Sequence, residues 1–121
     1  DLETDERLVS VLERLEQDGF TLCCATNSVR HSAIVQLTRR GFIDHLEFVF
    51  TNQDVVNPKP NTEIYLRCMI KAGVSPKETI ILEDSELGRK GARETGSRVL
   101  EIENSADVTY RKIRKFIDNV K

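Results

Sequence analysis

The chain has 121 residues, of which 39% are hydrophobic and 31% are charged, and its formal net charge is −2. This length suits one domain with a real core, so we expect residues 1–121 to form a single domain. The balanced charge gives no reason to expect nucleic acid or an anionic membrane as a partner. No apolar run approaches the roughly 20 residues of a membrane span, and we expect no signal peptide.

The three cysteines match neither a disulfide framework nor a zinc site, because their number is odd and no paired Cys-x-x-Cys spacing occurs. Cys23 and Cys24 are neighbours in an apolar run, so we expect both to be small buried hydrophobic residues. This use of cysteine favours the reducing environment of the cytoplasm.

Helices and strands are predicted to alternate along the whole chain. Apolar residues that recur at spacings of three and four indicate the helices, and short apolar or β-branched runs indicate the strands. In chain order we expect a helix over 4–19, a strand over 20–25, a helix over 29–40, a strand over 48–50, a helix over 62–72, a strand over 79–82, a helix over 86–94, a strand over 98–102 and a helix over 108–119. This order predicts an α/β, Rossmann-like fold in which helices cover a parallel sheet.

The predicted strand over 79–82 ends in two adjacent carboxylates, Glu83 and Asp84. Polar groups at the carboxyl end of a parallel strand are typical of a ligand site, and two carboxylates suit a hard cation such as Mg²⁺. The alternative interpretation is an acidic helix N-terminus that the helix dipole stabilises. Ser85 is expected to cap the following helix, and Gly88 and Gly91 to let that helix pack closely.

Two other strand ends also carry polar residues. Thr26, Asn27 and Ser28 follow the second predicted element and offer a hydroxyl and amides near a helix N-terminus, an arrangement that can bind phosphate. A simple helix cap is the more ordinary interpretation of these three residues. Lys59 lies between Pro58 and Pro60, which keep the loop extended and stiff, and its ammonium could face the same anion.

These motifs together resemble the haloacid dehalogenase superfamily of aspartate-nucleophile phosphatases, in particular its β-phosphoglucomutase and phosphoglycolate phosphatase-like branch. The resemblance covers roughly residues 19–102. It rests on residues 24–28 (CATNS) as motif II, residues 59–65 (KPNTEIY) as motif III and residues 81–88 (ILEDSELG) as motif IV. It implies a three-layer sandwich with a parallel sheet.

The resemblance also implies roles for five residues. Thr26 would bind the transferring phosphoryl group through its hydroxyl, and the amide of Asn27 would add a second donor. Lys59 would neutralise the phosphoryl oxygens and the nucleophile. Glu83 and Asp84 would position Mg²⁺, directly or through water. Thr26 and Lys59 are therefore the expected catalytic residues.

The sequence departs from the family at motif I, a strand ending in Asp-x-Asp whose first aspartate attacks phosphorus. Residues 1–4 (DLET) have only a superficial likeness to it, because no apolar strand precedes them. We therefore expect residues 1–121 to be a partial core domain that lacks the central first strand, the nucleophile and the family's substrate-selecting cap domain. In this family the motif I strand lies between the strands that would end at Thr26 and Glu83. Unpaired strand edges are costly, so we expect a segment not in this sequence, a partner chain or direct pairing of these two strands to fill the place of the missing strand.

Two functions follow as hypotheses. The first is a Mg²⁺-dependent phosphatase or phosphomutase acting on a small phosphorylated metabolite through an aspartyl-phosphate, with the aspartate supplied from outside these residues. Within the same superfamily the carboxylate pair favours this activity over dehalogenation. The second is a non-catalytic phosphate- and metal-binding or scaffolding domain. The segment alone is expected to be inactive in either case.

Overall fold

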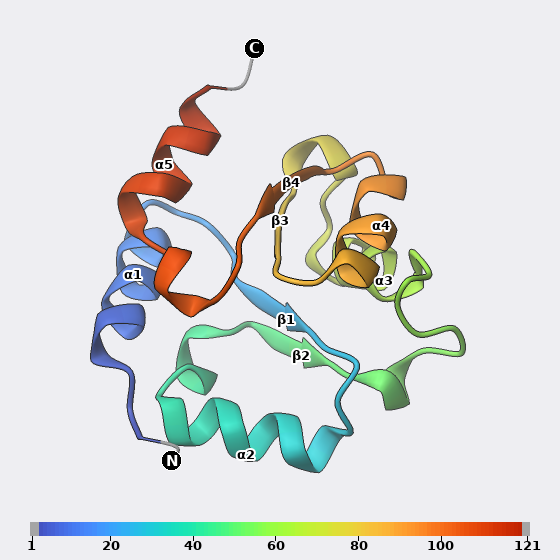
Figure 1. The fold of residues 1–121 in the computed structure, drawn as a ribbon, viewed down its shortest axis with the longest axis horizontal. Coiled ribbons are helices and arrows are strands. Elements are labelled where there is room, and N and C mark those ends of the chain that lie inside the picture. Colours follow the sequence, from blue (N-terminus) through green and yellow to red (C-terminus); the bar gives the residue numbers. More distant parts are fainter. Residues whose placement is uncertain (1–2, 120–121) are drawn as a thin grey trace. The chain divides into compact units, whose positions relative to one another are not determined.

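A computed structural model describes residues 3–119 of the chain (Figure 1). The chain divides into two compact units, residues 1–56 and residues 57–121, and each is described by itself. Asp1 and Leu2, which belong to the segment compared with motif I, lie outside the described residues. Within residues 3–119, no helix is both long enough and apolar enough to cross a membrane.

The first unit contains one pair of parallel strands, which run side by side in Figure 1. Its elements are α1 (Glu6–Gln17), β1 (Cys23–Ala25), α2 (Arg30–Arg40), a 3₁₀ turn (Ile43–His45), β2 (Phe48–Phe50) and a second 3₁₀ turn (Asn52–Asp54). Cys24 is aligned with Val49 in the register of the pair. The buried residues of this unit are Leu8, Val11, Leu15, Ala33, Val49 and Thr51.

The second unit contains the other parallel pair, with Ile81 aligned to Val99 and Glu83 to Glu101. Its elements are α3 (Glu63–Ala72), a 3₁₀ turn (Pro76–Glu78), β3 (Ile80–Glu83), α4 (Glu86–Glu94), β4 (Arg98–Glu101), a 3₁₀ turn (Ser105–Asp107) and α5 (Tyr110–Asp118). Helix α4 contacts both strands. The buried apolar residues are Ile64, Tyr65, Cys68, Met69, Ala92 and Ile113.

Local sequence signals account for the ends of the helices. Asp5 caps α1 by accepting a hydrogen bond from the Leu8 amide, and Ser85 caps α4 by accepting one from the Gly88 amide. Helix α2 ends at Gly41, whose φ of 86° lies in the left-handed region that glycine adopts without strain. The cap predicted at Ser85 is confirmed.

The α/β fold with parallel strands is confirmed, but the predicted burial of Cys23 and Cys24 is wrong. Cys23 is exposed and Cys24 is half-buried, although both were expected in the core. Ile80, Ile81 and Leu82 of β3 are also only half-buried. A strand in the middle of a sheet is covered by neighbours on both sides. Here every strand has a single hydrogen-bonded neighbour among the described residues, which leaves more of its surface accessible.

The strands of residues 3–119 form two separate two-stranded sheets, β1–β2 and β3–β4. Direct pairing of the two strands that would flank motif I, one of the expected ways to fill the gap, is therefore not what these residues form. The predicted strands over 20–25 and 98–102 are shortened to β1 and β4, the residues that are aligned in register with β2 and β3.

Candidate functional site

The first unit holds two of the predicted site residues, directly after β1. The Thr26 amide donates to the Phe50 carbonyl at 3.0 Å, which extends the ladder by one bond. The Thr26 hydroxyl oxygen accepts the Ser28 amide at 3.1 Å, so this hydroxyl shapes the turn as a cap would. Asn27 is exposed at the next position. Both residues lie at the carboxyl end of a parallel strand, as the sequence predicts.

The second unit brings Lys59 and Glu83 into contact. The Lys59 Nζ donates to Glu83 Oε2 at 2.5 Å, and only 11% and 8% of the two side chains are exposed. Glu83 is the last residue of β3, and Lys59 lies in the loop before α3. A buried carboxylate such as that of Glu83 needs a counter-charge and hydrogen-bond donors, because burial otherwise penalises its charge. Lys59 supplies both.

Tyr65, the last residue of motif III, is a third member of this cluster, and the sequence pattern predicts no role for it. The Tyr65 hydroxyl lies 2.5 Å from Glu83 Oε2 and 3.0 Å from the Gly88 carbonyl oxygen. Burial, and then the hydrogen bond to Glu83 and its negative charge, raise the pKa of Tyr65 well above its ordinary value. The signal that could have found Tyr65 is its place two positions after Glu63 at the start of α3, on the face that includes Ile64 and Cys68.

Two glycines of α4 make room for this cluster. A Cβ atom at Gly88 would lie 2.2 Å from Glu83 Oε1, and one at Gly91 would lie 2.6 Å from the Pro60 carbonyl oxygen. Both distances are far below any normal contact, so a side chain at Gly88 would displace the Glu83 carboxylate and one at Gly91 would displace the loop backbone. The expected close packing of α4 is confirmed, and its partners are the Glu83 carboxylate and the backbone beside Lys59.

Asp84 differs from Glu83 in its surroundings. Its side chain is exposed, and within residues 3–119 it makes no ion pair or side-chain hydrogen bond. Asp84 is therefore available to a ligand, whereas Oε2 of Glu83 already accepts two hydrogen bonds. Two adjacent carboxylates, one of them available, fit the part of a Mg²⁺ donor set that proteins usually supply, because Mg²⁺ keeps several waters. The described residues contain no group of three or more His, Cys, Asp or Glu side chains that could hold a metal.

Arg89 holds the backbone at the carboxyl end of β3, where the chain leaves the sheet and enters the turn that contains Asp84. Its Nη2 donates to the Ile102 carbonyl at 2.7 Å and its Nε to the Glu83 carbonyl at 3.3 Å. The Ile102 amide also donates to the Glu83 carbonyl, at 3.0 Å. These bonds join the carboxyl ends of β3 and β4, so the start of the Asp84 turn is fixed on both strands.

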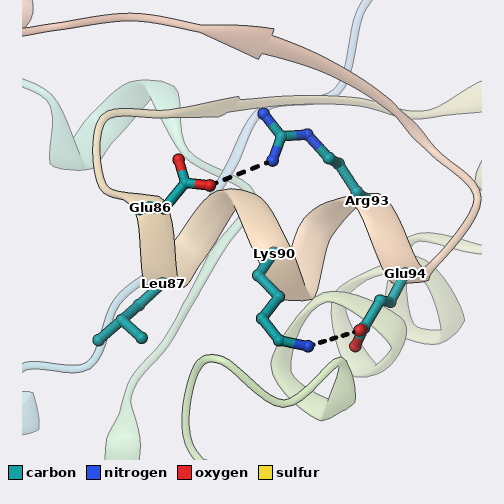
Figure 2. Close-up of a pocket in the computed structure, with 5 residues that line it drawn as sticks. All are labelled: Glu86, Leu87, Lys90, Arg93 and Glu94. Carbon is teal, nitrogen blue, oxygen red and sulfur yellow. Dashed lines mark hydrogen bonds and ion pairs between the residues drawn. The ribbon is translucent and has the colours of Figure 1, made fainter.

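A pocket on α4 does not contain the predicted site. Figure 2 shows its lining, in which Glu86 faces Arg93 and Lys90 faces Glu94 in ion pairs. The lining residues are Glu86, Leu87, Lys90, Arg93 and Glu94. All four charged residues are exposed, and none of the predicted site residues is among them. This pocket is a solvated helix surface.

Comparison with known proteins identifies the family. A model of the haloacid dehalogenase-like hydrolase family matches residues 2–102. The chain belongs to this family. Its HAD-like α/β fold is also that of the HAD phosphatase from Thermococcus onnurineus, with a TM-score of 0.81 and 25% identity over 92% of this chain and 56% of that one.

Curated relatives of this haloacid dehalogenase-like chain include two phosphatases. The phosphorylated carbohydrates phosphatase of Thermotoga maritima is 28% identical over 70% of this chain and 39% of its own length. The pyrophosphatase PpaX of Halalkalibacterium halodurans is 27% identical over 78% of this chain and 44% of its own length. The chain thus spans less than half the length of these relatives.

Within the second unit, the structure brings together Lys59 and Glu83, and Asp84 follows Glu83 directly. Thr26 and Asn27 belong to the first unit, so their meeting with Lys59 stays a prediction, as do the catalytic, phosphate-binding and metal-binding roles of all five residues.

Proposed function

We propose that this chain is part of a Mg²⁺-dependent phosphatase or phosphomutase that acts on a small phosphorylated metabolite in the cytoplasm. The observation that carries the proposal is the buried cluster of Lys59, Glu83 and Tyr65 beside the available carboxylate of Asp84. A buried ion pair at a strand end is expensive unless every partner is satisfied, and such arrangements concentrate at functional sites.

The residues of this chain would bind and orient the phosphate. Lys59 would face the phosphoryl oxygens with its ammonium, which Glu83 holds at the end of β3. Thr26 and Asn27 would donate hydrogen bonds to the same group. Exposed amides at the start of a helix add to such binding, and α2 begins four residues after Thr26.

Asp84 and Glu83 would hold the Mg²⁺ ion, Asp84 through its available carboxylate and Glu83 directly or through water. When bound, the ion would neutralise charge on the phosphoryl oxygens. The fit is supported by the chemistry of the donor set, since both side chains offer the oxygen ligands that Mg²⁺ prefers.

The nucleophilic aspartate would come from a strand outside these 121 residues, because no apolar strand followed by Asp-x-Asp occurs among them. The second edge of β3 is the expected place for that strand. Its support is the half-burial of Ile80, Ile81 and Leu82 in a two-stranded sheet, which a further parallel neighbour would cover. A segment of the same protein or a partner chain could supply it.

The test is an assay of the intact protein on p-nitrophenyl phosphate and on a panel of sugar phosphates, with Mg²⁺ and with a chelator. We expect turnover with Mg²⁺, a loss of more than about 100-fold in kcat for Lys59→Met, and a similar loss for Asp84→Asn. Lys90→Met and Asp44→Asn are matched controls, because both remove one exposed charge elsewhere, and they should keep full activity.

Two outcomes would contradict the proposal. Full activity in Asp84→Asn would rule out the proposed role of the Asp84 carboxylate in holding Mg²⁺. Binding of inorganic phosphate and Mg²⁺ without turnover of any ester would favour the second candidate, a non-catalytic phosphate- and metal-binding domain, which the missing Asp-x-Asp strand supports.

A further inference from the structure

Tyr65 has a hydroxyl group in the middle of the buried cluster. Its ring belongs to the core of the second unit, where only 4% of the residue is exposed. Its hydroxyl has two acceptors, the Glu83 carboxylate at 2.5 Å and the Gly88 carbonyl at 3.0 Å. A phenol has one proton, and a charged carboxylate is the stronger acceptor. The proton is therefore donated mainly to Glu83.

Glu83 is held from three sides. Lys59 and Tyr65 both donate to the same oxygen, Oε2. On the other side, Gly88 approaches so closely that an added Cβ would overlap Oε1. These contacts leave the carboxylate one position.

Lys59 depends on the same two neighbours. Its Nζ bonds to Glu83 Oε2 and lies 5.3 Å from the centre of the Tyr65 ring, within the range of a cation–π contact. A lysine side chain has four rotatable bonds, and it holds one position only when its surroundings select that position. The Tyr65 ring provides one of its contacts, and the Tyr65 hydroxyl fixes the carboxylate that provides another.

We propose that Tyr65 is a positioning residue, whose hydroxyl fixes the Glu83 carboxylate and through it the Lys59 ammonium at the carboxyl end of β3. This inference rests on the proposed function, in which Lys59 faces the phosphate. Tyr65 itself need not touch the substrate. Its hydroxyl keeps the lysine in the orientation that binding and catalysis use.

Tyr65→Phe separates positioning from packing, because it keeps the ring and removes only the hydroxyl. We expect kcat of the intact protein on p-nitrophenyl phosphate with Mg²⁺ to fall about tenfold, and KM to stay within about twofold. Tyr110→Phe is the matched control: it makes the same chemical change at the other tyrosine of the chain, and it should keep kcat unchanged.

A second measurement reads the position of Lys59 without any turnover. In protein labelled with ¹⁵N-lysine, the Lys59 ammonium should give a slowly exchanging NMR signal, identified by its loss in Lys59→Met. The signal should broaden or disappear in Tyr65→Phe and persist in Tyr110→Phe. In the unsubstituted protein, the Tyr65 hydroxyl proton should show a nuclear Overhauser effect to this ammonium, which tests the contact even if Tyr65→Phe does not fold.

The outcomes separate the two proposals. If the intact protein has no activity, the proposed function fails and the lysine signal alone decides the role of Tyr65. The inference is overturned if the lysine signal is absent from the unsubstituted protein, or if Tyr65→Phe keeps it unchanged, whatever happens to kcat. An unchanged kcat together with a lost lysine signal would show that positioning of Lys59 is not used in the reaction, and would also overturn it.

Discussion

Two lysine–glutamate pairs of the second unit have the same chemistry in opposite environments. Lys59 and Glu83 are 2.5 Å apart with 11% and 8% of their side chains exposed. Lys90 and Glu94 are 2.7 Å apart on the outer face of α4, with 59% and 52% exposed (Figure 2). The distances alone would suggest similar interactions, whereas the exposed fractions of the side chains differ about fivefold or more.

The difference shows what each pair can do. The exposed pair joins residues four apart on one helix, and water screens it, so it contributes little to stability. The buried pair joins residues 24 apart, and a tyrosine hydroxyl shares its carboxylate. Because both charges are removed from water, loss of either partner leaves the other charge buried without its counter-charge, which lowers the free energy of unfolding. The buried pair therefore specifies where Lys59 lies, and four substitutions can test this contrast.

The largest effect is expected for Glu83→Gln. This change leaves the Lys59 ammonium opposite a neutral amide in a buried position, and it should lower the free energy of unfolding by about 3 kcal/mol. Urea unfolding of the full chain, followed by circular dichroism, measures it. A loss below about 0.5 kcal/mol would mean that the cluster is as solvated as the pair on α4.

A smaller loss is expected for Gly91→Ala, which tests how α4 encloses the buried pair. The new Cβ would lie 2.6 Å from the Pro60 carbonyl oxygen, so the backbone beside Lys59 must move. Overpacking of this kind costs about 2 kcal/mol. Helix propensity alone would stabilise α4 by up to about 1 kcal/mol, so the sign of the change in the free energy of unfolding shows which of the two effects is larger. A gain in stability would contradict the close packing.

Tyr65→Phe should lower the free energy of unfolding by about 1 kcal/mol at neutral pH, the typical value of one hydrogen bond. It should also change the alkaline pH dependence. Folding raises the pKa of Tyr65, so this stabilisation is complete below the unfolded-state tyrosine pKa of about 10 and is lost as the pH rises above it.

Above about pH 10, the free energy of unfolding should therefore fall more steeply with pH in the unsubstituted chain than in Tyr65→Phe. The difference between the two slopes should correspond to the release of at most one proton on unfolding. Urea unfolding at several pH values between about 8 and 11 measures the two slopes. Tyr110→Phe is the control for the loss of one tyrosine. Parallel curves for the unsubstituted chain and Tyr65→Phe would refute the raised pKa.

The smallest effect is expected for Glu94→Gln, the surface counterpart of Glu83→Gln. Removing this exposed charge should change the free energy of unfolding by no more than about 0.5 kcal/mol, and added salt should reduce the effect further. The same urea titrations, at low and high salt, provide the measurement. A loss as large as that of Glu83→Gln would remove the contrast between the two pairs.

Most of the fold could be predicted from local patterns. The helix predicted over 86–94 and the strand predicted over 48–50 have the same bounds in α4 and β2, because a serine cap and an alternation of turns and apolar residues mark their ends. The exposure of Cys23 could not be predicted in this way. Strand burial depends on neighbours along the sheet, and β1 has one such neighbour in the described residues.

The sequence by itself determined the order of the elements, the family and the strand ends that carry polar side chains. Only the tertiary structure decided how Glu83 and Asp84 differ, since adjacent residues at a strand end have the same local signal. Chain folding brings Lys59 and Tyr65, 24 and 18 residues away in sequence, onto Glu83 alone. Asp84 stays exposed because the side chains of neighbouring residues point in different directions as the chain leaves the sheet.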